Sequence, residues 1–299
     1  MTGIRKETLL KIALTATEEK NISRDALAEK LGVSSMTVGK AVRALTAAGL
    51  LLEARDPISR GRHASLFSPS DFPLYIGVFL SADKVTLAAE SLAGEEIATI
   101  SRAINPSLTC KENVTSIIRE LFGLYELENR LVARATVILS DRDDFNGFDI
   151  PKDELYETES LASSEIKSHF PEENVLYINV SGDVIKPLIV SRGNVFSRGG
   201  AKKIYTSSHA DTARRIAHLT HSLSAYAKIH RVIIEGDTNE GHELLFLIKE
   251  ALLSDFGMAK KDIPSLEYYE RLSFLRKALF DSLRKSHIES VCDSLFVEQ

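Results

Sequence analysis

The residues near the N-terminus with the clearest chemical role are polar or cationic and fall on one predicted helix and the loop after it. Ser34 can cap a helix that buries Val38, Val42 and Leu45. Its outer face carries side chains able to reach base edges and phosphates in a DNA major groove, and the loop can reach the flanking backbone or minor groove. The predicted DNA-contacting residues are Ser34, Ser35, Met36, Thr37, Lys40, Arg43, Arg55, Arg60, Arg62 and His63.

Short elements on either side must position these residues. An apolar face over 8–16 predicts a first helix, and Ser23 can cap a second one that closes at Gly32. Strands predicted at 50–54 and 64–68 flank a turn-rich loop and form a wing. The pattern predicts a winged helix-turn-helix that binds duplex DNA. A plain three-helix bundle and a winged helix that binds protein are the alternatives.

Composition excludes several classes. The 299 residues are 44% hydrophobic and 26% charged, which is typical of a folded globular protein. Two cysteines exclude a disulfide framework and a four-cysteine zinc site. We expect a cytoplasmic protein, since no apolar run reaches membrane-spanning length and charges fill the N-terminal stretch. Residues 1–70 hold 11 Lys and Arg against 7 Asp and Glu within a chain of net charge −5, so the basic head suits a polyanion.

The rest of the chain repeats one pattern. A meander, a helix and a buried strand occur over 74–139 and again over 175–235, which predicts a duplicated α/β lobe. We therefore expect domains at 1–70, 71–171 and 172–299, with 69–73 as a linker. The stretch 265–285 is predicted to be one helix, with Leu272, Leu275, Leu279 and Leu283 on one stripe.

Several segments resemble the ROK family of repressors and sugar kinases. Residues 22–70 are similar to the DNA-binding head of its repressor branch. Residues 75–100 and 175–200 are similar to its two phosphate-binding hairpins, and 231–237 to the turn near its adenosine site. The resemblance implies a winged helix-turn-helix joined to a two-lobed actin-like or hexokinase-like ATPase fold. It also implies a regulator, expected to be a repressor, that binds a palindromic operator as a homodimer or higher homo-oligomer. A sugar or sugar derivative is the effector that the resemblance suggests.

The kinase motifs of that family do not carry over. Its Asp-x-Gly-x-Thr hairpin reads Phe79, Ser81 and Asp83 here, and residues 201–204 replace its Glu-x-Gly-His segment. Its Asn-Asp pair has no counterpart. Phosphoryl transfer needs a base and a metal with preorganised donors. We predict a body without enzyme activity, cofactor or metal. A carbohydrate kinase with an atypical site is the alternative, and a protein-interaction module is a third hypothesis.

Three turns remain as candidate ligand sites. The turn at 199–200 could cradle an anion through its backbone. The turn at 236–237 follows a strand end, where α/β folds place ligands, and the turn at 181–182 belongs to the second hairpin that resembles a phosphate-binding one. A plain hairpin end is the competing interpretation. The predicted ligand-binding residues are Ser181, Gly182, Gly199, Gly200, Gly236 and Asp237. His218 and His221 have helical i, i+3 spacing, but we interpret them as exposed helix residues rather than metal ligands.

Overall fold

The computed structural model describes residues 4–55, 65–80, 84–127, 129–139, 155–181, 184–196, 204–236, 241–270 and 273–297. The chain forms two compact units. Unit 1 holds 1–156 and 279–299, and unit 2 holds 157–278. The predicted boundaries after residues 70 and 171 stay predictions. Among the described helices, none combines the length and apolar character that a membrane crossing requires.

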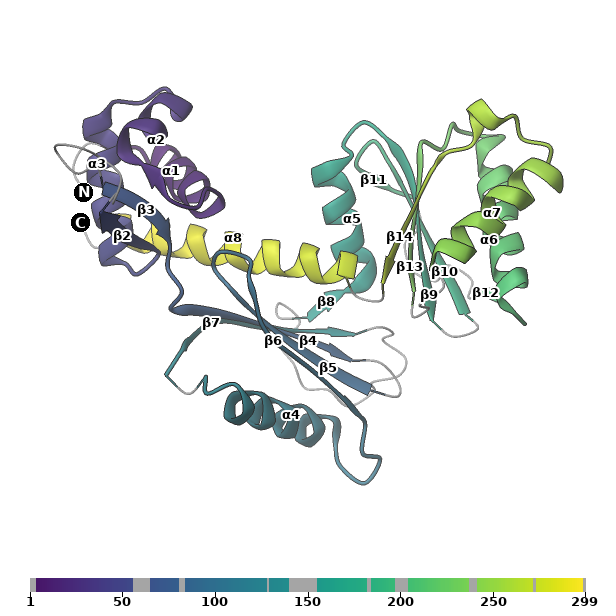
Figure 1. Cartoon of the computed structure of the whole chain (residues 1–299), viewed down its shortest axis with the longest axis horizontal. Coiled ribbons are helices and arrows are strands. Elements are labelled where there is room, and N and C mark those ends of the chain that lie inside the picture. Colours follow the sequence, from purple (N-terminus) through teal and green to yellow (C-terminus); the bar gives the residue numbers. More distant parts are fainter. Residues whose placement is uncertain are drawn as a thin grey trace. The chain divides into compact units, whose positions relative to one another are not determined.

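Unit 1 begins with three helices and a small sheet (Figure 1). The helices are α1 (Lys6–Glu18), α2 (Arg24–Leu31) and α3 (Ser35–Ala47). The strands β1 (Ile22–Ser23), β3 (Ser65–Pro69) and β2 (Leu51–Arg55) pair in that order, antiparallel. The order of elements is that of a winged helix-turn-helix, which confirms the predicted head.

Local signals set these helix boundaries. The Ser23 hydroxyl accepts from the Ala26 N–H at 3.2 Å and begins α2. Gly32 ends α2 in the left-handed region at φ 63°, a conformation that glycine adopts without a Cβ penalty. The three helices share one apolar core, whose fully buried members include Leu9, Ile12, Leu27, Val38 and Leu45. This core fixes α3 relative to α1 and α2.

The α/β part of unit 1 is a five-stranded sheet in the order β6-β5-β4-β7-β8. Strand β4 pairs antiparallel with β5 and parallel with β7. Helix α4 (Cys110–Leu124) covers one face through Val114, Ile117 and Leu121. The strands are β4 (Pro73–Leu80), β5 (Lys84–Ser91), β6 (Glu96–Ala103), β7 (Leu131–Leu139) and β8 (Leu155–Glu157).

The opposite face of this sheet packs against α8 (Ser273–Val297), from Leu279 onward (Figure 1). Gly77 permits the contact, since a Cβ there would lie 2.7 Å from Leu279 Cδ2 and 3.3 Å from Phe280 Cζ. Further along α8, Cys292 is a free, fully buried thiol. Burial raises its pKa to about 11, because an apolar surrounding disfavours the thiolate. Lys6 in turn forms an ion pair with Asp293 at 2.5 Å.

Unit 2 contains a second mixed sheet, in the order β11-β10-β9-β13-β14, with β12 also paired to β10. Helices α6 (His209–Ser224) and α7 (Gly241–Ser254) cover one face, and α5 (Thr158–His169) lies on the other (Figure 1). The strands are β9 (Asn174–Ser181), β10 (Val184–Ser191), β11 (Asn194–Val195), β12 (Ile204–Tyr205), β13 (Arg231–Gly236) and β14 (Ser265–Glu270).

The predicted helix over 265–285 is wrong in its first part. Residues 265–270 form β14, which pairs in parallel with β13 from Arg231↔Ser265 to Gly236↔Glu270. The helix begins only at Ser273 and runs to Val297. The adjacent tyrosines of β14 favour a strand, whereas the leucine stripe is helical only from Leu275 onward.

The two sheets repeat a Leu-Tyr-Ile triplet, at 74–76 in β4 and 176–178 in β9, and both buried tyrosine hydroxyls are hydrogen-bonded. The Tyr75 hydroxyl lies 2.7 Å from His287 Nδ1 on α8. The Tyr177 hydroxyl donates to Glu235 Oε2 at 2.6 Å. The same Glu235 carboxylate accepts from the Phe274 N–H at 2.9 Å and so caps the start of α8. Burial and the adjacent Glu235 charge raise the Tyr177 pKa well above its usual value.

Candidate nucleic-acid interface

The turn between α2 and α3 is held by side-chain hydrogen bonds. Ser34 Oγ accepts from the Thr37 N–H at 3.1 Å, so Ser34 is the N-cap of α3 as predicted. Its hydroxyl also lies 2.8 Å from the Thr37 hydroxyl. Ser35 donates to Asp25 Oδ1 at 2.7 Å and links α3 to α2. These three hydroxyls therefore make hydrogen bonds within the protein that stabilise the turn.

Three other side chains project from the outer face of α3. Met36 is 73% exposed, and Lys40 and Arg43 are exposed on the following turns. Arg43 Nε donates to the Gly39 carbonyl at 2.9 Å, which fixes the direction of the side chain while leaving the two terminal nitrogens of its guanidinium available. A thioether, an ammonium and a guanidinium can contact a thymine methyl, a phosphate and a guanine edge respectively.

Arg24 is a further candidate contact that the sequence reasoning missed. It is the first residue of α2, exposed, and its Cδ lies 3.4 Å from where a Cβ on Gly39 would be. The Arg24 side chain therefore lies against α3 at Gly39. Helix N-termini favour phosphate, and the first helix of such a motif crosses the DNA backbone. The position just after the Ser23 cap was the available signal. Asp25, 3.6 Å from Arg24, reduces the local positive charge.

The wing is described only at its base. Strands β2 and β3 pair from Leu51↔Pro69 to Arg55↔Ser65, so they carry residues 56–64 between their ends. Arg55 ends β2, but its side chain lies outside the described structure. Arg60, Arg62 and His63 are likewise outside the described residues. Their predicted contacts stay predictions.

Two of the predicted ligand-binding residues of the body can be placed. Ser181 ends β9 and Gly236 ends β13, and these neighbouring parallel strands align Val180 with Gly236. The other four, Gly182, Gly199, Gly200 and Asp237, lie outside the described residues. The two strand ends thus meet at one edge of the sheet, where α/β folds bind ligands.

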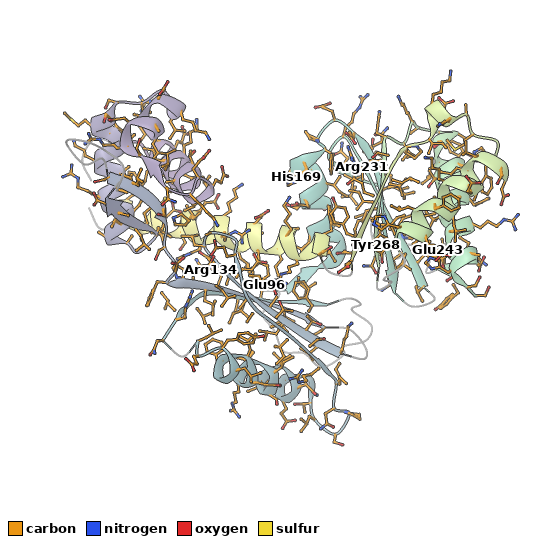
Figure 2. All side chains as sticks on the ribbon, viewed as in Figure 1. Glu96, Arg134, His169, Arg231, Glu243 and Tyr268 are labelled. Carbon is orange, nitrogen blue, oxygen red and sulfur yellow. The ribbon has the colours of Figure 1, made fainter. Side chains whose placement is uncertain are left out.

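Tyr268, which the sequence reasoning did not single out and which is labelled in Figure 2, lies at this edge. Its hydroxyl donates to the Gly236 carbonyl at 2.9 Å. A Cβ on Gly241, the first residue of α7, would lie 2.2 Å from the Tyr268 ring. The tyrosine therefore occupies the space between the end of β13 and the start of α7.

The position that resembles the metal-binding aspartate of sugar kinases is apolar. Phe79 is 4% exposed, and its Cε2 lies 3.2 Å from where a Cβ on Gly77 would be. An aromatic ring offers no oxygen ligand to Mg²⁺. Asp83 and residues 201–203 lie outside the described part of the chain.

The helix histidines pack against an aromatic ring. His221 stacks on Phe256 with ring centroids 5.3 Å apart, and His218 meets the same ring edge-on at 5.7 Å. Over the described ranges, no group of three or more His, Cys, Asp or Glu could hold a metal ion. The described contact of both histidine rings is with Phe256.

The fold and the exposed face of α3 define a winged helix-turn-helix protein. A family model described as an HTH domain matches residues 5–57. No curated protein matches the sequence. The structure is similar to that of a ROK family transcriptional regulator, a homolog of the E. coli MLC protein. The TM-score is 0.61 at 13% identity, over 95% of this chain and 99% of the other. The chain therefore shares the fold of that regulator over most of its length.

Two further structures have lower scores. A ROK family protein from Streptococcus pneumoniae TIGR4 in complex with sucrose gives a TM-score of 0.48 at 11% identity, over 71% of this chain and 99% of the other. A ROK family glucokinase from Streptomyces griseus in complex with glucose and AMPPNP gives 0.48 at 12% identity, over 74% and 98%.

Proposed function

We propose that this protein is a DNA-binding transcriptional regulator that recognises a two-fold symmetric operator as a homodimer. The observation that carries the proposal is the outer face of α3. Met36, Lys40 and Arg43 are exposed there on a helix whose inner face is fully buried. A rigid helix that exposes cationic and apolar side chains on one face suits the major groove of DNA. The matched HTH family model and the shared fold with a ROK regulator support the same function.

Binding to selected duplexes tests the proposal. Purified protein is used to select sites from a random DNA pool, and affinity for the selected duplex is then measured by fluorescence anisotropy at several salt concentrations. Each phosphate contact contributes about −0.9 to the slope of log affinity against log salt. Replacing Lys40 and Arg43 together by Ala should lower the affinity by at least about tenfold. Lys111→Ala, an exposed lysine on α4, is the matched control. Affinity independent of salt and of Lys40 and Arg43 would contradict DNA recognition.

Two-fold symmetry is part of the proposal because one winged helix reads few base pairs. A dimer reads two half-sites, and the second contact is intramolecular, which raises the overall affinity. Selected sites without two-fold symmetry would contradict the dimeric part while leaving DNA binding intact.

For the body, we propose regulation without phosphoryl transfer. Phe79 supports this, because it places an apolar ring where the resemblance expects a metal ligand. The body then serves to dimerise or to bind an effector, a sugar or sugar derivative by the resemblance, in a cytoplasmic protein. Incubation with Mg-ATP and hexoses should yield no sugar phosphate. Metal-dependent turnover would instead favour the kinase alternative.

A further inference from the structure

Strand β14 is the outer strand of the unit 2 sheet. It pairs with β13 on one side, and no other described strand pairs with its outer edge. Its four central residues are half-buried and its two end residues are exposed. An exposed edge presents backbone N–H and C=O groups that can pair with another strand. Natural edge strands are usually protected from pairing with another chain by a bulge, a proline or charged side chains. The side chains beside β14 therefore determine which partner strand could pair with it.

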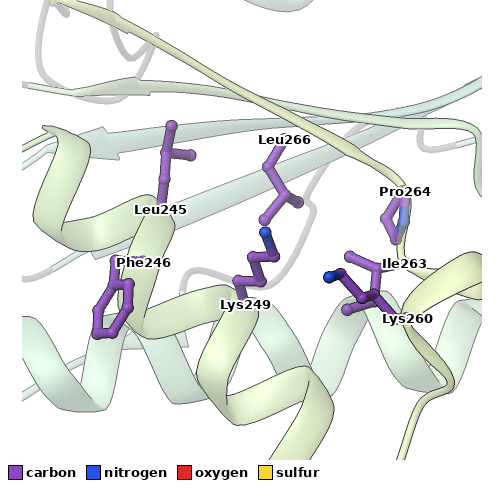
Figure 3. A pocket seen from close by; sticks show the side chains of 7 residues that line it. All are labelled: Leu245, Phe246, Lys249, Lys260, Ile263, Pro264 and Leu266. Atoms are coloured by element: carbon purple, nitrogen blue, oxygen red, sulfur yellow. The ribbon is translucent and has the colours of Figure 1, made fainter.

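A basic hollow lies beside the N-terminal half of β14, between α7 and the turn before the strand (Figure 3). Its cavity of about 480 Å³ has mostly apolar walls, including Ile263 and Leu266. Lys249 and Lys260 extend into it from opposite sides (Figure 3). Neither ammonium group has a hydrogen-bond or ion-pair partner among the described residues. Two unpaired cations over an apolar floor suit a carboxylate with apolar neighbours.

A second hollow, of about 510 Å³, lies beside the C-terminal half of the same strand. Its charged residues are Glu267 and Glu270. Glu267 is already paired with Arg231, a residue labelled in Figure 2. The exposed Glu270 carboxylate has no partner within the described structure. Both hollows share Leu245 and Leu266, so they form one groove with a basic end, an apolar centre and an acidic end.

This order of charges is self-complementary under a two-fold rotation. When two β14 strands run antiparallel, the acidic end of each lies beside the basic end of the other, and the apolar centres coincide. An isologous dimer requires such a surface. We propose that β14 and the groove along it, defined by Leu245, Lys249, Lys260, Leu266 and Glu270, form the interface with a second copy of this chain. The inference rests on the dimeric part of the proposed function and not on DNA binding itself.

Charge reversal tests the interface in the full-length protein. Sedimentation equilibrium gives the dimer dissociation constant for the wild type, Lys260→Glu, Glu270→Lys and the double variant. Each single reversal places like charges together and should raise the dissociation constant at least about tenfold. The double variant restores opposite charges and should return to within about threefold of the wild type. Lys261→Glu is the control, because this exposed neighbour of Lys260 does not line the groove.

Three results of the sedimentation experiment would contradict the proposed interface. A monomeric wild type, single variants that dimerise like the wild type, or a double variant no better than the singles would overturn the interface. Thermal melting of every variant, followed by circular dichroism, separates loss of the interface from loss of folding. Because these substitutions lie on the surface, each variant should melt like the wild type. Anisotropy with the selected duplex is measured in parallel. If the wild type binds DNA in a salt-dependent way but the charge reversals do not change dimerisation as expected, this inference alone is refuted. If the wild type is a dimer that does not bind DNA, the proposed regulator is refuted instead.

Discussion

The Tyr75–His287 pair makes the stability of unit 1 depend on pH. The His287 ring is half-buried between β4 and α8, and its Nδ1 lies 2.7 Å from the Tyr75 hydroxyl. Burial, with a smaller effect of the Arg134 charge, lowers the pKa of His287 from 6.5 to about 4. Below pH 6.5 the unfolded chain therefore binds a proton that the folded chain rejects. The free energy of unfolding is unaffected above that pH and falls as the pH drops toward 4.

The size of the effect follows from the shift. One pKa unit corresponds to about 1.4 kcal/mol, so the full shift would imply about 3 kcal/mol. Solvent screens a half-buried ring, so we expect about 1 kcal/mol between pH 7 and pH 5, above the range in which most carboxylates titrate. His287→Asn keeps an oxygen acceptor for Tyr75 but does not titrate. This variant should lose that pH dependence.

The measurement is urea unfolding at pH 7, 6 and 5. Unfolding is monitored by far-ultraviolet circular dichroism, because the chain has no tryptophan. The wild type should lose about 1 kcal/mol more than His287→Asn over this range. His218→Asn, which removes an exposed imidazole, should follow the wild type. Parallel pH profiles for the wild type and His287→Asn would refute the reasoning.

Three other predictions concern packing, a buried hydrogen bond and DNA. Gly77→Ala should cost about 1–3 kcal/mol of unfolding free energy by overpacking, whereas Gly123→Ala, with open space around it, should be neutral or stabilise by up to about 1 kcal/mol. Tyr177→Phe should cost about 1–3 kcal/mol, because the buried Glu235 carboxylate loses a donor; an unchanged urea midpoint would contradict this. Arg24→Ala should weaken binding to all duplexes alike and reduce the salt slope by about 1 for each head, and a changed base preference would rule out a phosphate contact.

Features fixed by neighbouring residues could be predicted from the sequence. Ser23 and Ser34 cap α2 and α3, and Gly32 ends α2, as the sequence pattern indicated. The two predicted repeats, over 74–139 and 175–235, also begin and end within one residue of the observed strands. In each case, a cap, a turn residue or an alternating apolar run carries the information locally.

Features fixed by contacts across the chain could not be predicted in this way. The Ser35–Asp25 hydrogen bond joins two helices, so the sequence indicated only that Ser35 faces outward. Strand β14 was predicted as helix because its pairing with β13 is remote in sequence. Tyr268 filling the edge beside Gly236 depends on that same pairing. The contacts of the wing residues stay predictions.

Cys292 gives the molecule a built-in reporter. Its thiol is fully buried on α8, and a pKa of about 11 leaves only a trace of thiolate at neutral pH. A thiol reagent can therefore label it only when the end of α8 separates transiently from its surroundings. In a Cys110→Ser background, the labelling rate then measures the free energy of that local opening under native conditions. Because the adjacent Asp293 pairs with Lys6 at the start of α1, the same rate reports how firmly the DNA-binding head is held to the end of α8.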